Sequence, residues 1–195
     1  MKSLRLLAVI AAAVALTLLV QAALAGPSAQ TVSIIAGKSV SAIKVVRSAD
    51  LISTKASTWQ NVPGASTSIM IPSNTSGLIL VRFSAVANLL ANPNCGCGQI
   101  AQGLTRVLVG GIEAEPSTGP TAAFLTARTP EDENPNDPYL AGRPTQSEID
   151  RSAGPLPAGV YQVQVQWMVV DISNPSVVMT FDLSDWSLTV ERVQA

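Results

Sequence analysis

A stretch of alternating apolar and polar residues constrains the fold of this chain more than any other feature. Between residues 160 and 170 the odd positions carry Tyr161, Val163, Val165, Trp167 and Val169, and these alternate with glutamines at positions 162, 164 and 166. A period of two residues places successive side chains on opposite faces of a strand. The pattern therefore predicts a half-buried antiparallel strand with one face in a core and the other in water.

The C-terminal segment repeats this alternation but changes phase. Its apolar residues first occupy odd positions (Val177, Met179, Phe181, Leu183) and then even ones (Trp186, Leu188, Val190). A slip of one residue moves every following side chain to the other face, so the change at Ser184-Asp185 predicts an inserted residue, as a β-bulge or a tight corner. A corner would let the two halves belong to different sheets.

The segment from Arg106 to Glu115 predicts a hairpin around Gly110-Gly111, a pair that can supply the positive φ angles of a two-residue turn. The expected cross-strand pairs are Val109 with Ile112, Val107 with Ala114, Leu108 with Glu113, and Arg106 with Glu115. The first two pairs form the apolar side. The opposite charges of Arg106 and Glu115 support the register.

Five further strands are predicted at residues 31–35, 40–46, 67–71, 78–86 and 122–127. Residues 78–83 are apolar at nearly every position, which predicts a strand covered on both sides, with Arg82 directed to water or a carboxylate. Many short strands separated by turn residues predict an all-β, antiparallel β-sandwich. A jelly roll is favoured over the alternative, an immunoglobulin-like sandwich, because two distant cysteines bracketing a tryptophan are missing.

The N-terminus has the features of a cleavable signal peptide. Lys2 and Arg5 precede an uncharged apolar run from Leu6 to Val20, and Ala23-Leu24-Ala25 supplies the small residues of a cleavage site. The apolar run is shorter than the roughly 20 residues of a membrane-spanning helix, which disfavours an uncleaved anchor. We expect residues 1–25 to be removed, leaving residues 26–195 as one secreted domain in the periplasm, at the cell surface or outside the cell, without a membrane span.

The charge of the chain disfavours nucleic acid as a partner. The formal net charge is -1, and losing the two basic residues of the leader makes it about -3. Binding to phosphates needs a basic surface, which this sequence does not supply.

The chain contains no histidine. This excludes Ser-His-Asp and Cys-His catalysis, histidine acid-base chemistry and nearly all catalytic zinc sites. An enzyme would have to use carboxylates, as glycosidases do, or a lysine base such as Lys38, Lys44 or Lys55. No catalytic set is visible, so we expect a protein that is not an enzyme.

Two loops carry candidate sites. Cys95 and Cys97 are predicted to form a strained disulfide that stiffens their loop; redox activity, intermolecular bonding, metal capture and free thiols are the alternatives. The acidic loop at residues 131–139 offers hard oxygen ligands for calcium, the one cofactor considered, from Glu131, Asp132, Glu133 and Asp137. The alternative is a solvated loop, since the EF-hand spacing is absent.

The three tryptophans have different surroundings. Trp167 and Trp186 are in phase with core positions, so we expect both to be buried. Trp59 lies among Thr58, Gln60 and Asn61, which predicts an exposed ring able to stack on a ligand such as a sugar.

Three segments carry a resemblance to known proteins: Gly77 to Ala85, Pro157 to Trp167, and Asp185 to Arg192. They resemble strands of exported bacterial β-sandwich proteins. The Gly-x-Tyr-x-Val strand is also similar to strands of tumour-necrosis-factor-like and complement-C1q-like jelly rolls. The latter resemblance implies a jelly roll and, by analogy, trimerisation.

Taken together, these features favour a secreted, non-enzymatic β-sandwich that binds a carbohydrate, an envelope polymer or a protein at the cell surface. One alternative is a self-assembling structural protein that forms homo-oligomers. The other is a carboxylate-based glycoside hydrolase, which needs two acids within about 10 Å of each other across a cleft.

Overall fold

The computed structural model describes residues 30–34, 40–90, 100–119, 123–128, 144–172 and 179–194. Within these residues the regular elements are all strands, and no helix there could cross a membrane. The strands are β1 (Gln30–Ile34), β2 (Val40–Ser48), β3 (Ile52–Thr54), β4 (Gln60–Ile71), β5 (Gly77–Leu90), β6 (Ile100–Val109), β7 (Ile112–Glu113), β8 (Leu125–Arg128), β9 (Thr145–Leu156), β10 (Gly159–Asp171) and β11 (Thr180–Gln194). The seven predicted strand regions overlap β1, β2, β4, β5, β8, β10 and β11.

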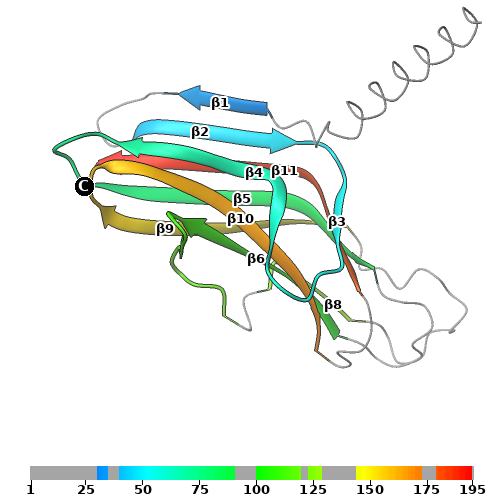
Figure 1. Ribbon diagram of the computed structural model, residues 1–195. Helices are drawn as coiled ribbons and strands as arrows, with labels where there is room; N and C mark the ends of the chain where they lie inside the picture. Colours follow the sequence, from blue (N-terminus) through cyan, green and yellow to red (C-terminus); the bar gives the residue numbers. More distant parts are fainter. Residues whose placement is uncertain are drawn as a thin grey trace, which may run out of the picture.

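The strands form two antiparallel sheets. The six-stranded sheet has the order β1-β2-β11-β5-β9, with β3 also paired to β11, and runs from β1 at the top of Figure 1 to β9 at the bottom. The five-stranded sheet has the order β4-β10-β6-β7, with β8 also paired to β6.

The pairings are nested along the chain. Strand β2 pairs with β11, β4 with β10, β5 with β9, and β6 with β7 and β8. One long antiparallel hairpin rolled into two facing sheets gives this order, which is that of a jelly roll. The predicted antiparallel sandwich is confirmed, and the jelly-roll order excludes the immunoglobulin-like alternative.

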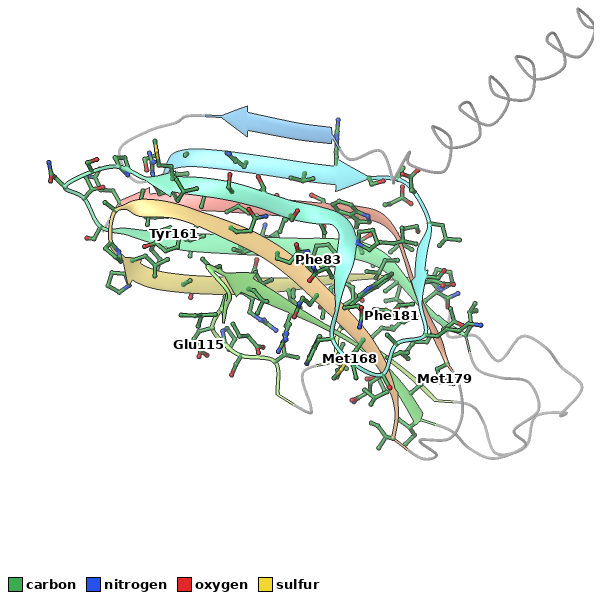
Figure 2. All side chains as sticks on the ribbon, viewed as in Figure 1. Phe83, Glu115, Tyr161, Met168, Met179 and Phe181 are labelled. Carbon is green, nitrogen blue, oxygen red and sulfur yellow. The ribbon has the colours of Figure 1, made fainter. Side chains whose placement is uncertain are left out.

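The core lies between the inner faces of the two sheets. The odd-numbered apolar residues of β10 from Val163 to Val169 are at most 4% exposed, which confirms the predicted alternation. The Phe181 ring lies 5.9 Å from that of Trp167 and 6.4 Å from that of Phe124. Figure 2 shows Phe181 and Phe83 between the layers. Trp186 is 1% exposed, so both predicted core tryptophans are buried.

The predicted phase change in β11 is a β-bulge. Its register with β5 shifts between Ser184 and Ser187, and Asp185 has a φ of 47°. Both halves of β11 remain paired with β5, so the idea that they belong to different sheets is wrong. The bulge absorbs the extra residue within the ladder, and the strand continues in the same sheet.

The predicted hairpin is present. Gly110 and Gly111 have φ angles of 61° and 85°, Val109 pairs with Ile112, and Leu108 pairs with Glu113. Ile112, however, is 76% exposed, so the expected apolar side ends before the turn.

The predicted pairing of Arg106 with Glu115 is wrong. Arg106 Nη1 instead lies 3.6 Å from Glu113 Oε2. The backbone of Glu115 exchanges hydrogen bonds of 2.8 and 2.7 Å with Ser152 of β9. The chain has left β6 by this point, because its backbone bonds to the edge of the other sheet.

Strand β5 is fully covered on one side only. Ile79, Val81 and Phe83 are buried, whereas Leu78 and Leu80 are half-buried, so the expectation of cover on both sides is wrong. Arg82 points outward and its Nε lies 2.8 Å from Asp150 Oδ1, as the sequence predicts. The outer face of the six-stranded sheet is open here, which explains why Arg82 is tolerated in an apolar run.

Candidate binding groove

The outer face of the five-stranded sheet carries an apolar groove along β10 and β6. Met168 of β10 pairs with Leu104 of β6, and Val170 pairs with Gln102. Glutamines occupy the outward positions 162, 164 and 166 of β10, whereas residues 168–170 are apolar on both faces. Figure 2 shows Met168 toward the lower end of β10. These residues form the floor of the groove.

Trp59 forms one wall. The Val169 N–H donates a 2.9 Å hydrogen bond to the carbonyl of Ala56, which holds the segment before β4 beside β10. The resulting hollow has a volume of about 490 Å³. It is lined by Trp59, Gln102, Leu104, Thr118, Gly119, Met168, Val170 and Ile172.

A polar network holds Trp59 in place. The Arg106 guanidinium lies 4.4 Å from the centre of the Trp59 ring, a cation–π contact. Arg106 Nε donates to Gln166 Oε1 at 2.8 Å, and Gln166 Nε2 donates to Asn61 Oδ1 at 2.9 Å. Arg106 is therefore held in one position from which it covers one face of the indole.

The same network fixes the opposite wall. Glu113, which pairs with Arg106, accepts a 2.6 Å hydrogen bond from the Thr118 N–H through Oε1. The Thr118 hydroxyl donates to the carbonyl of Thr105 at 3.0 Å. Both walls are thus tied to one another through Arg106 and Glu113.

This arrangement is suited to binding. None of the described residues that line the groove is ionisable, so these residues supply no general acid or base. The neighbouring polar groups of Arg106, Gln166 and Glu113 already bond to protein partners. The groove therefore offers mainly apolar carbon and one aromatic ring to a ligand.

A second surface hollow, of about 320 Å³, lies on the outer face of the six-stranded sheet near Arg82. Arg82 Nε lies 2.8 Å from Asp150 Oδ1 and 3.4 Å from Glu148 Oε1. The hydrogen bond that Arg82 donates to Asp150, with the negative charges of Asp150 and Glu148, raises the pKa of the Arg82 guanidinium. Glu148 and Asp150 are neighbouring carboxylates of β9, and both pair with the one cation Arg82.

The structure places the other candidates as follows. Lys44 is half-buried in β2, Lys55 is exposed after β3, and neither lines the groove. Cys95, Cys97, Glu131, Asp132, Glu133, Asp137 and Lys38 lie outside the described residues. In the part of the chain that the structure describes, no three His, Cys, Asp or Glu residues lie close enough to share a metal ion.

The sequence singled out Trp59, which is half-buried beside Arg106, but it did not predict the floor of the groove. The signal was the end of the alternation at Trp167-Met168-Val169-Val170, where both faces become apolar. When the outward face of a sandwich strand is apolar, either another segment covers it or it leaves an apolar patch on the surface.

No family model matches the sequence, and a search of curated proteins found no match. Among solved structures, the chain is similar to dimeric latent PorU from Porphyromonas gingivalis, at 14% identity and a TM-score of 0.33, over 73% of this chain and only 11% of PorU. It is also similar to the CBM36-1 domain of a multidomain xylanase from the hindgut metagenome of Trinervitermes trinervoides, at 12% identity and a TM-score of 0.27, over 76% of this chain and 95% of that domain.

A third similar structure is the CBM22-1 xylan-binding domain of Xyn10C from Paenibacillus barcinonensis, at 8% identity and a TM-score of 0.26, over 88% of this chain and 84% of that domain. Matches this distant add nothing to the strand pairings described above. None of the three is a tumour-necrosis-factor-like or C1q-like domain, so that finer resemblance stays a prediction.

Proposed function

We propose that this chain is an exported, non-enzymatic binding module whose binding face is the groove beside Trp59. The observation that carries the proposal is the apolar floor of Met168, Leu104 and Val170, which lies on the outer face of a sandwich whose core is complete without it. Export is inferred from the leader sequence at residues 1–25. The absence of histidine from the sequence, and of ionisable groups among the described residues of the groove lining, supports a role in binding.

The composition of the groove favours a protein partner. Tryptophan, arginine and methionine are enriched in protein interfaces, and Trp and Arg contribute most to binding energy there. Trp59, Arg106 and Met168 lie together, and Ile172 at the end of the floor is 56% exposed. A partner that inserts an apolar side chain would bury this surface.

A carbohydrate fits less well. A sugar could stack on the free face of Trp59, but its hydroxyl groups also need donors and acceptors. Gln102 and Thr118 are the polar side chains among the described lining residues. The Thr118 hydroxyl already donates to the Thr105 carbonyl. The hydrophobic floor would leave most sugar hydroxyls unsatisfied.

Binding assays with a Trp59→Ala variant test the proposal. The probes are an array of apolar and aromatic peptides and a panel of soluble polysaccharides, with affinities measured by fluorescence titration. We expect peptides to bind the wild-type protein and to bind Trp59→Ala about 10–100-fold more weakly, as for a central interface residue. Val160→Ala is the matched control, since Val160 is an apolar residue of β10 that is 70% exposed outside the groove.

The other results have distinct meanings. Peptide binding that is equal in Trp59→Ala and Val160→Ala would show that the groove is not the binding face. Trp59-dependent binding of a polysaccharide alone would keep the groove and overturn the protein partner.

A further inference from the structure

Asp182 of β11 is a buried carboxylate with an unsatisfied oxygen. It alternates with the inner-face residues Phe181 and Leu183 and therefore belongs to the outer face of the six-stranded sheet, yet it is only 8% exposed. Its Oδ1 atom has no hydrogen-bond partner, and none of the ion pairs found among the described residues includes it. A buried carboxylate oxygen without a partner is unfavourable, so Oδ1 is suited to a cation or a donor.

A second unsatisfied oxygen lies on the neighbouring strand. Asn88 of β5 is the direct cross-strand partner of Asp182, and its Oδ1 is also buried without a hydrogen bond. Ser53 of β3 is the partner of Asp182 on the other side. Direct partners share one face of the sheet, with Cβ atoms about 4.5–5.5 Å apart. Ser53, Asp182 and Asn88 therefore form a row of oxygen-bearing side chains across three strands.

We propose that this row binds a calcium ion. Calcium prefers carboxylate, amide carbonyl and hydroxyl oxygens, and it completes its shell with water. Asp182 supplies the charge and the Asn88 carbonyl the second ligand, while Ser53 is exposed and leaves one side open for water. A site with one carboxylate binds weakly, with a dissociation constant of about 10⁻⁴–10⁻³ M, the range of extracellular modules. None of these three residues lines the groove or belongs to the acidic segment 131–139.

Thermal unfolding of chelator-treated protein in calcium chloride, with magnesium chloride at matched ionic strength as the reference, tests the site. Calcium at about ten times its dissociation constant should raise the melting temperature by about 3–6 °C. Asp182→Asn should abolish this rise. It should also melt at a higher temperature than the wild-type protein without calcium, because the buried charge is removed. Asn88→Asp should lower the calcium midpoint at least 10-fold by adding a carboxylate.

Two outcomes would overturn the proposal. The first is a direct hydrogen bond from the Asn88 amide to Asp182, in which case the wild-type protein shows no calcium response and Asn88→Asp only loses stability. The second is binding at the acidic loop, in which case the response persists in Asp182→Asn and disappears in a protein carrying both Asp132→Asn and Asp137→Asn. Retention of the response in that double variant supports the proposed site.

Discussion

The outer faces of the two sheets differ in how they meet water. On the six-stranded sheet, Arg82 carries a side chain that is 58% exposed and pairs with Glu148 and Asp150, which are 49% and 64% exposed. On the five-stranded sheet, Arg106 is 25% exposed and lies against Trp59 beside an apolar floor. Both faces use an arginine, but one arginine is solvated and the other is packed.

The two outer faces therefore differ in how tightly their arginines are packed. A solvated ion pair on a sheet contributes little to stability because water screens it. Arg106, which packs against Trp59 beside the half-buried Met168, has no role in closing the core, which lies on the opposite side of the same strands. The asymmetry between the faces is therefore the main structural argument for a binding groove on the five-stranded sheet.

Both faces rest on one core, and the largest effect should come from disturbing it. A Cβ atom at Gly103, on the inner face of β6, would lie 2.5 Å from Phe181 Cε2 of the opposite sheet. We expect Gly103→Ala to lower the free energy of unfolding by about 1–3 kcal/mol, because Phe181 is fully buried and cannot move aside without displacing its neighbours. Urea titration gives this value.

Gly119→Ala is the control for that experiment, since a Cβ atom there would meet nothing within 4 Å. Equal stability of the two variants would show that the sheets can separate locally, and the two outer faces could then not be treated as parts of one rigid scaffold.

The sequence predicted the strands whose two faces differ in polarity. In β10, valines alternate with glutamines, and in β11 the shift of parity identified the bulge at Ser184 to Ser187. The Gly110-Gly111 pair predicted the hairpin because few other residues adopt two successive positive φ angles. These features are local, so they are readable without knowing which strands are neighbours.

Strand β9 was not predicted, because its sequence gives no alternating signal. Residues 145–156 include Glu148, Asp150, Arg151, Gly154 and Pro155, which favour turns and loops. They form a strand because their backbone pairs with β5. On its other side β9 is an edge strand, whose backbone groups can bond to water. Tertiary pairing overrides local preference here.

The candidate groove was predictable only in part. The polar neighbours of Trp59 indicated an exposed ring, but its partners Arg106 and Met168 lie 47 and more residues away along the chain. They meet Trp59 because β4 and β6 both pair with β10, a neighbourhood set by the jelly-roll order. No local pattern encodes that order.

The next effect in size should come from the packed arginine. Arg106→Met removes the cation–π contact to Trp59 and the hydrogen bond to Gln166, and it leaves Glu113 without its ion-pair partner. We expect a loss of about 1–2 kcal/mol in the free energy of unfolding, together with a change in Trp59 fluorescence. Arg106→Lys should keep part of the charge interaction and lose the fixed planar geometry. A variant with unchanged stability and fluorescence would mean that Trp59 is not held by Arg106.

The smallest effect should come from the solvated arginine. Arg82→Met should leave the free energy of unfolding unchanged within the error of a urea titration, because the pairs with Glu148 and Asp150 are exposed. The raised pKa of Arg82 means that any stabilisation from its charge is present below the ordinary arginine pKa and is lost only as the pH rises through the still higher folded-state value. Melting temperatures of wild-type and Arg82→Met protein should therefore run parallel between about pH 6 and pH 9. A clear loss of stability in Arg82→Met, comparable with that in Arg106→Met, would make the two outer faces equivalent and remove the asymmetry that points to the groove.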